Sequence, residues 1–168
     1  YVRRGDRWYV AATGDVADLG LDTAPGLWEL GPVRLTSTAH FLLISHPEQE
    51  ARAAAIGGLA EEALALLRAR WPDSWSERMP IILPASTAEL QQLLQTTLDL
   101  DKFVAFVGYG SRRDDGYATT APRMYIQDQN LGSYGRAFQL ETLVHELVHA
   151  ASASRAGPFI PAWVHEGV

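Results

Sequence analysis

The sequence lacks cysteine altogether, contains a single lysine, Lys102, and has no long apolar run. Without cysteine, neither disulfide bonds nor cysteine-ligated zinc can form. No apolar segment approaches the roughly 20 residues that a membrane-spanning helix needs. Acidic residues outnumber basic ones by 20 to 14, so the net charge is −6 and the pI is about 5.3. Binding to nucleic acid depends on basic patches, so this acidic chain is a poor candidate for it.

Apolar residues, by contrast, make up 47% of the 168 residues, which is typical of a globular protein with a real core. Residues 1–13 alternate as in a strand, whereas 14–32 are rich in glycine and proline and are typical of a linker. We therefore expect residues 1–32 to be the end of a preceding domain and a linker, and residues 33–168 to form the main domain.

Hydrophobic periodicity and turn residues predict the elements of the main domain. They are a strand or hairpin over 33–45, a helix over 47–71, a strand over 79–85, a helix over 87–97, strands over 102–110 and 123–129, a helix over 136–155, and a last helix starting near Pro161. Ser86 and Glu89 form the capping-box pattern at the start of the second helix. The fold class predicted is α+β, with a small mixed or antiparallel sheet packed on helices.

The helix over 136–155 contains the sequence LVHELVHAAS, residues 143–152, with the pattern H-E-x-x-H. Residues four apart on a helix differ by about 40° around its axis, so His145 and His149 project from one face. That spacing lets two imidazoles bind one metal ion, and Glu146 projects about 100° to the side, toward a bound water. The apolar stripe is expected on the other side of the helix: Leu140, Leu143, Val144, Leu147 and Ala151.

The tail AWVHEG, residues 162–167, places a glutamate 17 residues after His149 on a second helix. With this tail, the region 33–168 resembles the gluzincin zinc metallopeptidases, and most closely the bacterial peptidase MA-like domains. These proteins carry an H-E-x-x-H helix followed by a Trp-x-x-Glu-Gly segment, here Trp163, Glu166 and Gly167. The resemblance implies a zincin-like fold, with His145, His149 and Glu166 as zinc ligands and Glu146 as general base. The N-terminal run Gly-Asp-Arg-Trp-Tyr-Val also resembles the final strand of NTF2-like domains.

The family resemblance carries further expectations about substrate and location. The substrate would be a peptide or protein, paired with an edge strand to which Phe106, Val107, Gly108 and Tyr109 contribute. Membrane contact would come only through segments outside this chain, and the resemblance favours a membrane-anchored or exported bacterial protein. Family members carry further functional residues after the glutamate ligand, so we expect the natural domain to continue past Val168.

The roles of several other residues are predicted less specifically. Glu141 either holds His145 through a hydrogen bond or is a solvated carboxylate at the helix start. His165, beside Glu166, points away from the metal and is expected either at the surface or in support of a ligand. Trp163 is expected to be a packing anchor. Ordinary structural or surface roles are expected for His40 and His46. Nothing selects a transition-state donor among Tyr109, Tyr117, Tyr125 and Tyr134. Two functional alternatives also stay open: a zincin-fold module that binds zinc without turnover, and a zinc-free structural domain.

Overall fold

A computed structural model describes residues 2–9, 24–71, 75–108 and 122–152 of the chain. The first of these segments is an antiparallel hairpin of β1 (Val2–Arg4) and β2 (Arg7–Tyr9), which forms a sheet of its own. Gly5 has φ of 62°, a conformation that favours glycine and suits a two-residue hairpin turn. The single strand predicted over residues 1–13 is therefore wrong, because the chain reverses at Gly5.

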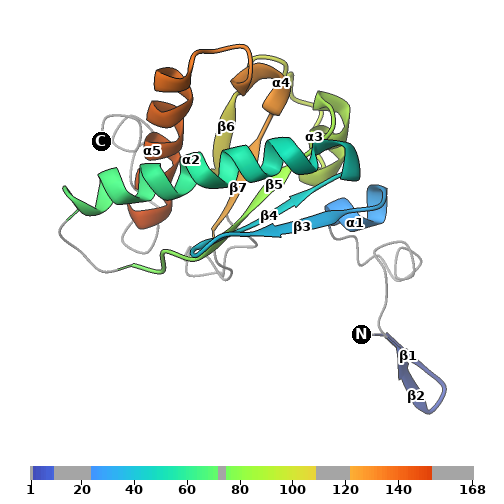
Figure 1. The fold of residues 1–168 in the computed structure, drawn as a ribbon. Helices are drawn as coiled ribbons and strands as arrows, with labels where there is room; N and C mark the ends of the chain where they lie inside the picture. Colours follow the sequence, from blue (N-terminus) through green and yellow to red (C-terminus); the bar gives the residue numbers. More distant parts are fainter. Residues whose placement is uncertain (1, 10–23, 72–74, 109–121, 153–168) are drawn as a thin grey trace.

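The second sheet contains five strands: β3 (Arg34–Ser37), β4 (Phe41–Ser45), β5 (Met79–Leu83), β6 (Ala105–Gly108) and β7 (Arg123–Ile126). Their spatial order is β3-β4-β5-β7-β6 (Figure 1). The three central strands are parallel, whereas β3 and β6 each run antiparallel to their neighbour. The predicted α+β class with a small mixed sheet is confirmed.

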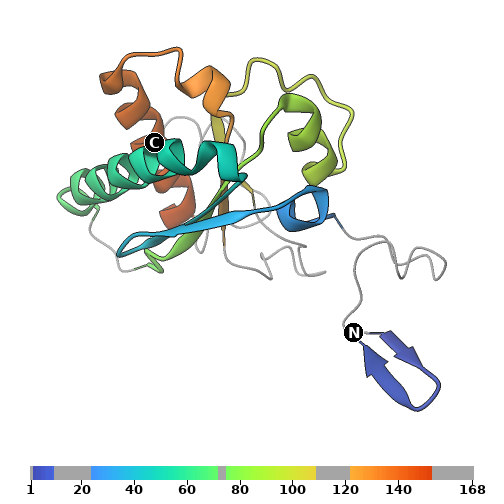
Figure 2. The ribbon, with the colours of Figure 1, turned by 45° about the vertical axis from the view of Figure 1, so that its right-hand side comes forward.

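Helices cover both faces of this sheet. The helical elements are α1 (Leu27–Leu30), the 3₁₀ turn η2 (Pro47–Gln49), α2 (Glu50–Arg68), α3 (Thr87–Leu94), α4 (Asp128–Leu131) and α5 (Arg136–Ser152). α2 and α5 pack against one face, and α1 and α3 lie on the other, as the two views in Figures 1 and 2 show. None of the described helices is long and apolar enough to cross a membrane.

Two apolar clusters follow from the alternation of side chains along each strand. Leu43, Ile81 and Met124 point to the α2 and α5 side, and each is fully buried. The next residue along each strand packs with α1 and α3 on the opposite side, a set made up of Ile44, Ile82 and Tyr125. The sheet is therefore apolar on both faces and needs both helical layers.

Two short elements differ from the prediction. α1 lies inside the predicted linker, and its Leu27 is 1% exposed among the residues that pack with Ile44 and Ile82. This part of the expected linker therefore contributes to the core. α4 begins at Asp128, inside the strand predicted over 123–129.

The predicted cap of α3 is confirmed at Ser86, whose hydroxyl accepts from the Glu89 N–H at 3.2 Å. The second half of the capping box is wrong. The Glu89 carboxylate accepts from the N–H of Ala85 and binds His46, because the histidine lies beside it in the fold.

Gly57 lies where α2 crosses β4 and the turn before it. A Cβ at this position would be 2.9 Å from Thr38 Cγ2 and 3.0 Å from Leu43 Cδ1. Ordinary carbon contacts are about 3.5–4.0 Å. The glycine therefore allows the helix and the strand to approach closely, whereas a Cβ on the adjacent Gly58 would have no atom within 4 Å.

Candidate metal site

The orientation of α5 is fixed first at its N-terminal end. The buried Gln139 side chain donates to the carbonyl of Tyr134 at 2.7 Å, and its Oε1 accepts from Arg52 of α2 at 3.1 Å. The same arginine donates to Asp128 of α4 at 2.6 Å. One guanidinium thus joins α2, α4 and the first turn of α5.

The rotation of α5 about its axis is set by the core. Leu143, Leu147 and Ala151 are buried against α2 and the sheet, as the predicted apolar stripe requires. Leu140 and Val144 are only partly buried and pack at the edge of this cluster. Because the leucines hold this side of the helix inward, the direction in which every other α5 side chain projects from the helix axis is fixed.

His145 and His149 lie side by side at the margin of that buried stripe, and both are partly exposed. Their Nε2 atoms are 2.9 Å apart, and the two rings meet edge to face with centroids 4.5 Å apart. Two nitrogens bound to one zinc at roughly 2.0–2.1 Å cannot be more than about 4 Å apart. The contact is a hydrogen bond between the two rings, and its length lies within this limit, so the nitrogens are close enough to share a metal ion.

Glu146 lies between the two histidines in sequence and is 6% exposed, which is rare for a carboxylate. The helix geometry predicted that Glu146 projects to the side of His145, but it did not predict its burial. A carboxyl group in such a place is largely shielded from bulk water.

The third predicted ligand, Glu166, lies outside the described residues, and so do Trp163 and His165. Within the described ranges, no group of three His, Asp or Glu side chains is placed to hold a metal ion. The structure thus brings together two of the three predicted ligands. Glu141 is exposed, as expected of a solvated carboxylate, but it lies in the second turn of α5 and not at the helix start.

The predicted substrate strand is β6, which lies at the edge of the sheet and packs against α5. Its residues divide between the two faces. Val107 packs on the α5 side, whereas Phe106 packs with the cluster under α1 and α3. Gly108 shares the face of Phe106 and lies under the ring of Tyr125, where a Cβ would be 3.1 Å from Tyr125 Cε2. Tyr109 lies outside the described residues.

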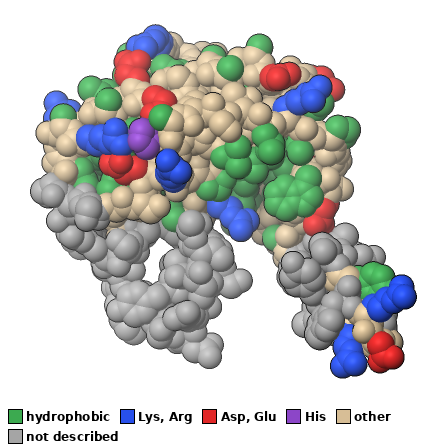
Figure 3. Space-filling view, turned by 60° about the horizontal axis from the view of Figure 1, so that its bottom comes forward, with side chains coloured by type: hydrophobic (Ala, Val, Ile, Leu, Met, Phe, Trp, Pro, Cys, Tyr) green, Lys and Arg blue, Asp and Glu red, His purple; other side chains and the backbone are tan. Residues whose placement is uncertain are grey.

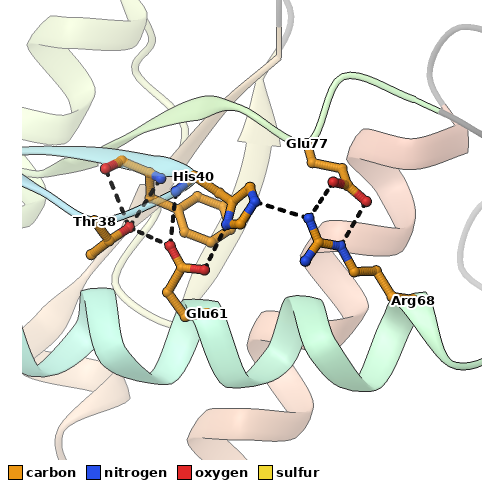
Figure 4. Close-up of polar contacts among 6 residues, drawn as sticks. Thr38, His40, Glu61, Arg68 and Glu77 are labelled. Carbon is orange, nitrogen blue, oxygen red and sulfur yellow. Dashed lines mark hydrogen bonds and ion pairs between the residues drawn. The ribbon is translucent and has the colours of Figure 1, made fainter.

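A second polar cluster joins the turn between β3 and β4 to α2 (Figure 4). His40 Nδ1 is 2.7 Å from Glu61 Oε2, and Arg68 Nη2 is 2.9 Å from His40 Nε2. An arginine only donates, so His40 Nε2 accepts and its proton lies on Nδ1, toward Glu61. Because both ring nitrogens are engaged, His40 has a structural role, as expected. The network itself was not predicted, since His40 is 21 residues from Glu61 and 28 residues from Arg68 in sequence.

This network also sets the charge state of Glu61. Burial favours the neutral acid, but hydrogen bonds from the Thr38 hydroxyl and from the ring and backbone of His40 outweigh it. They hold the pKa of Glu61 below its ordinary value. A depression of about 510 Å³ adjoins the cluster at the turn and at β5, and it shares no residue with the histidine pair on α5.

His46 is a second structural histidine. Its Nδ1 is 2.8 Å from the Pro32 carbonyl and its Nε2 is 2.8 Å from Glu89 Oε1. Burial lowers the pKa of His46, but these two hydrogen bonds and the charges of Glu89 and Glu48 outweigh it and raise the pKa. A doubly protonated ring donates both bonds, whereas a neutral ring donates only one.

Apolar side chains also gather on the face of the domain seen in Figure 3. Large exposed apolar residues on α1, β3 and β4 are Trp28, Leu35 and Leu42, with exposures of 59%, 63% and 38%. Leu35 and Leu42 lie on the side of the sheet that α1 and α3 cover only in part. None of these residues belongs to α5 or β6.

Comparisons with protein-family models, curated proteins and solved structures found no match to this chain. The interpretation of the site therefore depends on its own geometry and on the sequence pattern.

Proposed function

We propose that the protein is a zinc-dependent metallopeptidase of the gluzincin type, with a zincin-like fold. The observation that carries this proposal is the approach of His145 and His149 Nε2 to 2.9 Å, on the helix that also carries the buried Glu146. Two imidazoles at this separation are a donor set that suits zinc. Glu166 would complete the site with a carboxylate, as the resemblance implies.

A zinc ion bound there would supply Lewis acidity, polarising the scissile carbonyl and lowering the pKa of a bound water to about 7. The chain's own contribution is proton transfer and positioning. Glu146 takes a proton from the attacking water on its carboxylate and then gives it to the departing amine nitrogen. β6 holds the peptide in an extended conformation through backbone hydrogen bonds at the sheet edge.

The test combines metal analysis with digestion of a peptide library. The wild type is expected to bind about one zinc ion per chain and to cleave some peptides. Glu146→Gln keeps the shape of the side chain but cannot accept the water proton, so cleavage should fall by roughly 100-fold or more, in the range typical of a lost general base, while zinc remains bound. Glu29→Gln is the matched control, because this glutamate is exposed on α1.

Undiminished cleavage by Glu146→Gln would remove the proposed mechanism. Stoichiometric zinc with no cleavage by the wild type would favour the alternative of a zinc-binding scaffold module. Absence of zinc from protein purified without chelators would favour a zinc-free structural domain.

A further inference from the structure

The outer edge of β6 presents backbone groups in a defined pattern. The N–H of Gln127 donates to the carbonyl of Val104 at 2.9 Å, and these residues are opposite each other in the ladder of β6 and β7. Hydrogen-bonded pairs alternate along an antiparallel ladder, so Phe106 and Gly108 also point their backbone groups toward β7. The N–H and C=O of Ala105 and Val107 therefore point outward, and no described strand pairs with them.

A peptide could pair with β6 as a further strand of the sheet. Its side chains would then alternate between the two faces in step with those of β6, because residues directly opposite each other share a face. A peptide residue opposite Ala105 or Val107 would point to the side of α5, where the histidine pair lies. The residue opposite Phe106 would point to the other face. Cβ atoms of opposite residues are roughly 4.5–5.5 Å apart, so that side chain would contact the Phe106 ring.

Phe106 belongs to a row of three aromatic rings. It stacks on Tyr125 with centroids 5.2 Å apart, and Phe103 meets it edge to face at 6.2 Å. Tyr125 is buried, whereas Phe103 is 47% exposed. The loop that carries Phe103 is anchored by Asn130, whose side-chain nitrogen donates to the carbonyls of Asp101 and Phe103. An exposed apolar ring is thus held at the open edge of the strand.

We propose that the pair Phe103–Phe106 selects an apolar or aromatic side chain at one position of a peptide bound along β6. The inference rests on the proposed function in one respect, namely that the ligand is an extended peptide. Only an extended backbone supplies donors and acceptors that match Ala105 and Val107. The selected side chain lies on the face opposite α5, and its two neighbours point toward the histidine pair.

The experiment measures binding and cleavage separately. A random decapeptide library is selected for binding to the Glu146→Gln protein, and the same library is digested by the wild type. The bound peptides should share one position dominated by Phe, Tyr, Leu or Met. Aromatic contacts predict that an aromatic residue there binds roughly 2- to 10-fold more tightly than alanine.

Phe103→Ala and Phe106→Leu, each combined with Glu146→Gln, should reduce this preference, and the leucine retains the apolar packing under α1 and α3. Phe138→Ala is the matched control, because Phe138 is 42% exposed at the start of α5 and stacks on Tyr134, outside the row of rings that contains Phe103 and Phe106. It should leave the preference unchanged. A preference that persists in both β6-edge variants, or a library without any enriched peptide, would overturn the proposal.

The two proposals fail in different ways. If the wild type cleaves no peptide but the bound peptides show the apolar position, the protein binds peptides without being a peptidase. If cleavage depends on Glu146 but shows no such position, the peptidase stands and the role of the aromatic pair is rejected.

Discussion

Replacing Gly57 by alanine, with Gly58→Ala as its partner, tests how closely α2 approaches the β3–β4 hairpin. Each substitution removes a glycine from the middle of the same helix, which should stabilise the protein by about 0.8–1 kcal/mol through helix propensity. The two positions differ in their surroundings. The new Cβ at Gly57 would be 2.9 Å from Thr38 Cγ2 and 3.0 Å from Leu43 Cδ1, whereas at Gly58 it would have no atom within 4 Å.

The neighbours of Gly57 cannot move freely. The Thr38 hydroxyl donates to Glu61 at 2.6 Å and accepts from the Phe41 N–H at 3.0 Å, and Leu43 is fully buried. Overpacking of this kind costs about 1–3 kcal/mol. The helix propensity is common to both variants, so Gly57→Ala should be less stable than Gly58→Ala by about 1–3 kcal/mol. For a chain of this size, that separates their Tm values by roughly 2–12 °C.

Urea unfolding of both variants and the wild type measures the free energy of unfolding directly. Gly58→Ala should exceed the wild type, and Gly57→Ala should fall below it or match it. Thr38→Ser removes Cγ2 but keeps the hydroxyl, so adding it to Gly57→Ala should recover part of the loss. Equal stability of the two alanine variants would refute the close packing of α2 on the hairpin.

The remaining predictions concern buried pairs and the core under the histidines. The folded pKa of His46 is raised above 6.5, so its pairing with Glu89 contributes stability that is fully present below about pH 6.5 and is lost as pH rises through the folded value. Glu89→Gln should therefore cost about 1–2 kcal/mol at pH 5.5 and less at pH 9 in urea unfolding, and a constant cost would contradict this. The folded pKa of Glu61 is lowered below 4.5, so Glu61→Gln should lower the free energy of unfolding at pH 7. The difference between wild type and variant should shrink as the pH falls through the folded pKa of Glu61, and a difference that persists in acid would contradict this. Leu147→Ala should lower the free energy of unfolding by about 2–5 kcal/mol because Leu147 is fully buried, and a loss under 1 kcal/mol would show that α5 is not held by this side chain.

Local patterns in the sequence predicted the elements that carry the site. α2 and α5 have apolar residues at helical spacing, so their existence and buried sides follow from the chain itself. The relation between His145 and His149 also depends only on helix geometry, which is why the predicted shared face agrees with the structure. β6 and β7 were likewise predicted from their β-branched and aromatic residues.

Contacts between distant segments could not be predicted in this way. The partner of His46 is 43 residues away, and that of His40 is 21 residues away. The sequence shows that Phe106 and Val107 point to opposite faces, but not which face α5 covers. The burial of Glu146 could not be predicted for the same reason, since it depends on where α2 and the sheet lie around α5. α1 was missed because four residues between glycines carry no periodicity.

The parallel centre of the sheet also determines how the chain can fold. β5 pairs with β4 across the length of α2, and with β7 across α3 and β6, so neither pairing can form before a long loop closes. The β3–β4 hairpin and α2, by contrast, need only local contacts. We therefore expect refolding to begin at residues 34–68 and to be limited by the closure of β7 onto β5. α5 follows β7 in the chain and packs on the completed sheet, so the burial of Glu146 on this helix should form last, whereas the two imidazoles can meet as soon as α5 itself is helical.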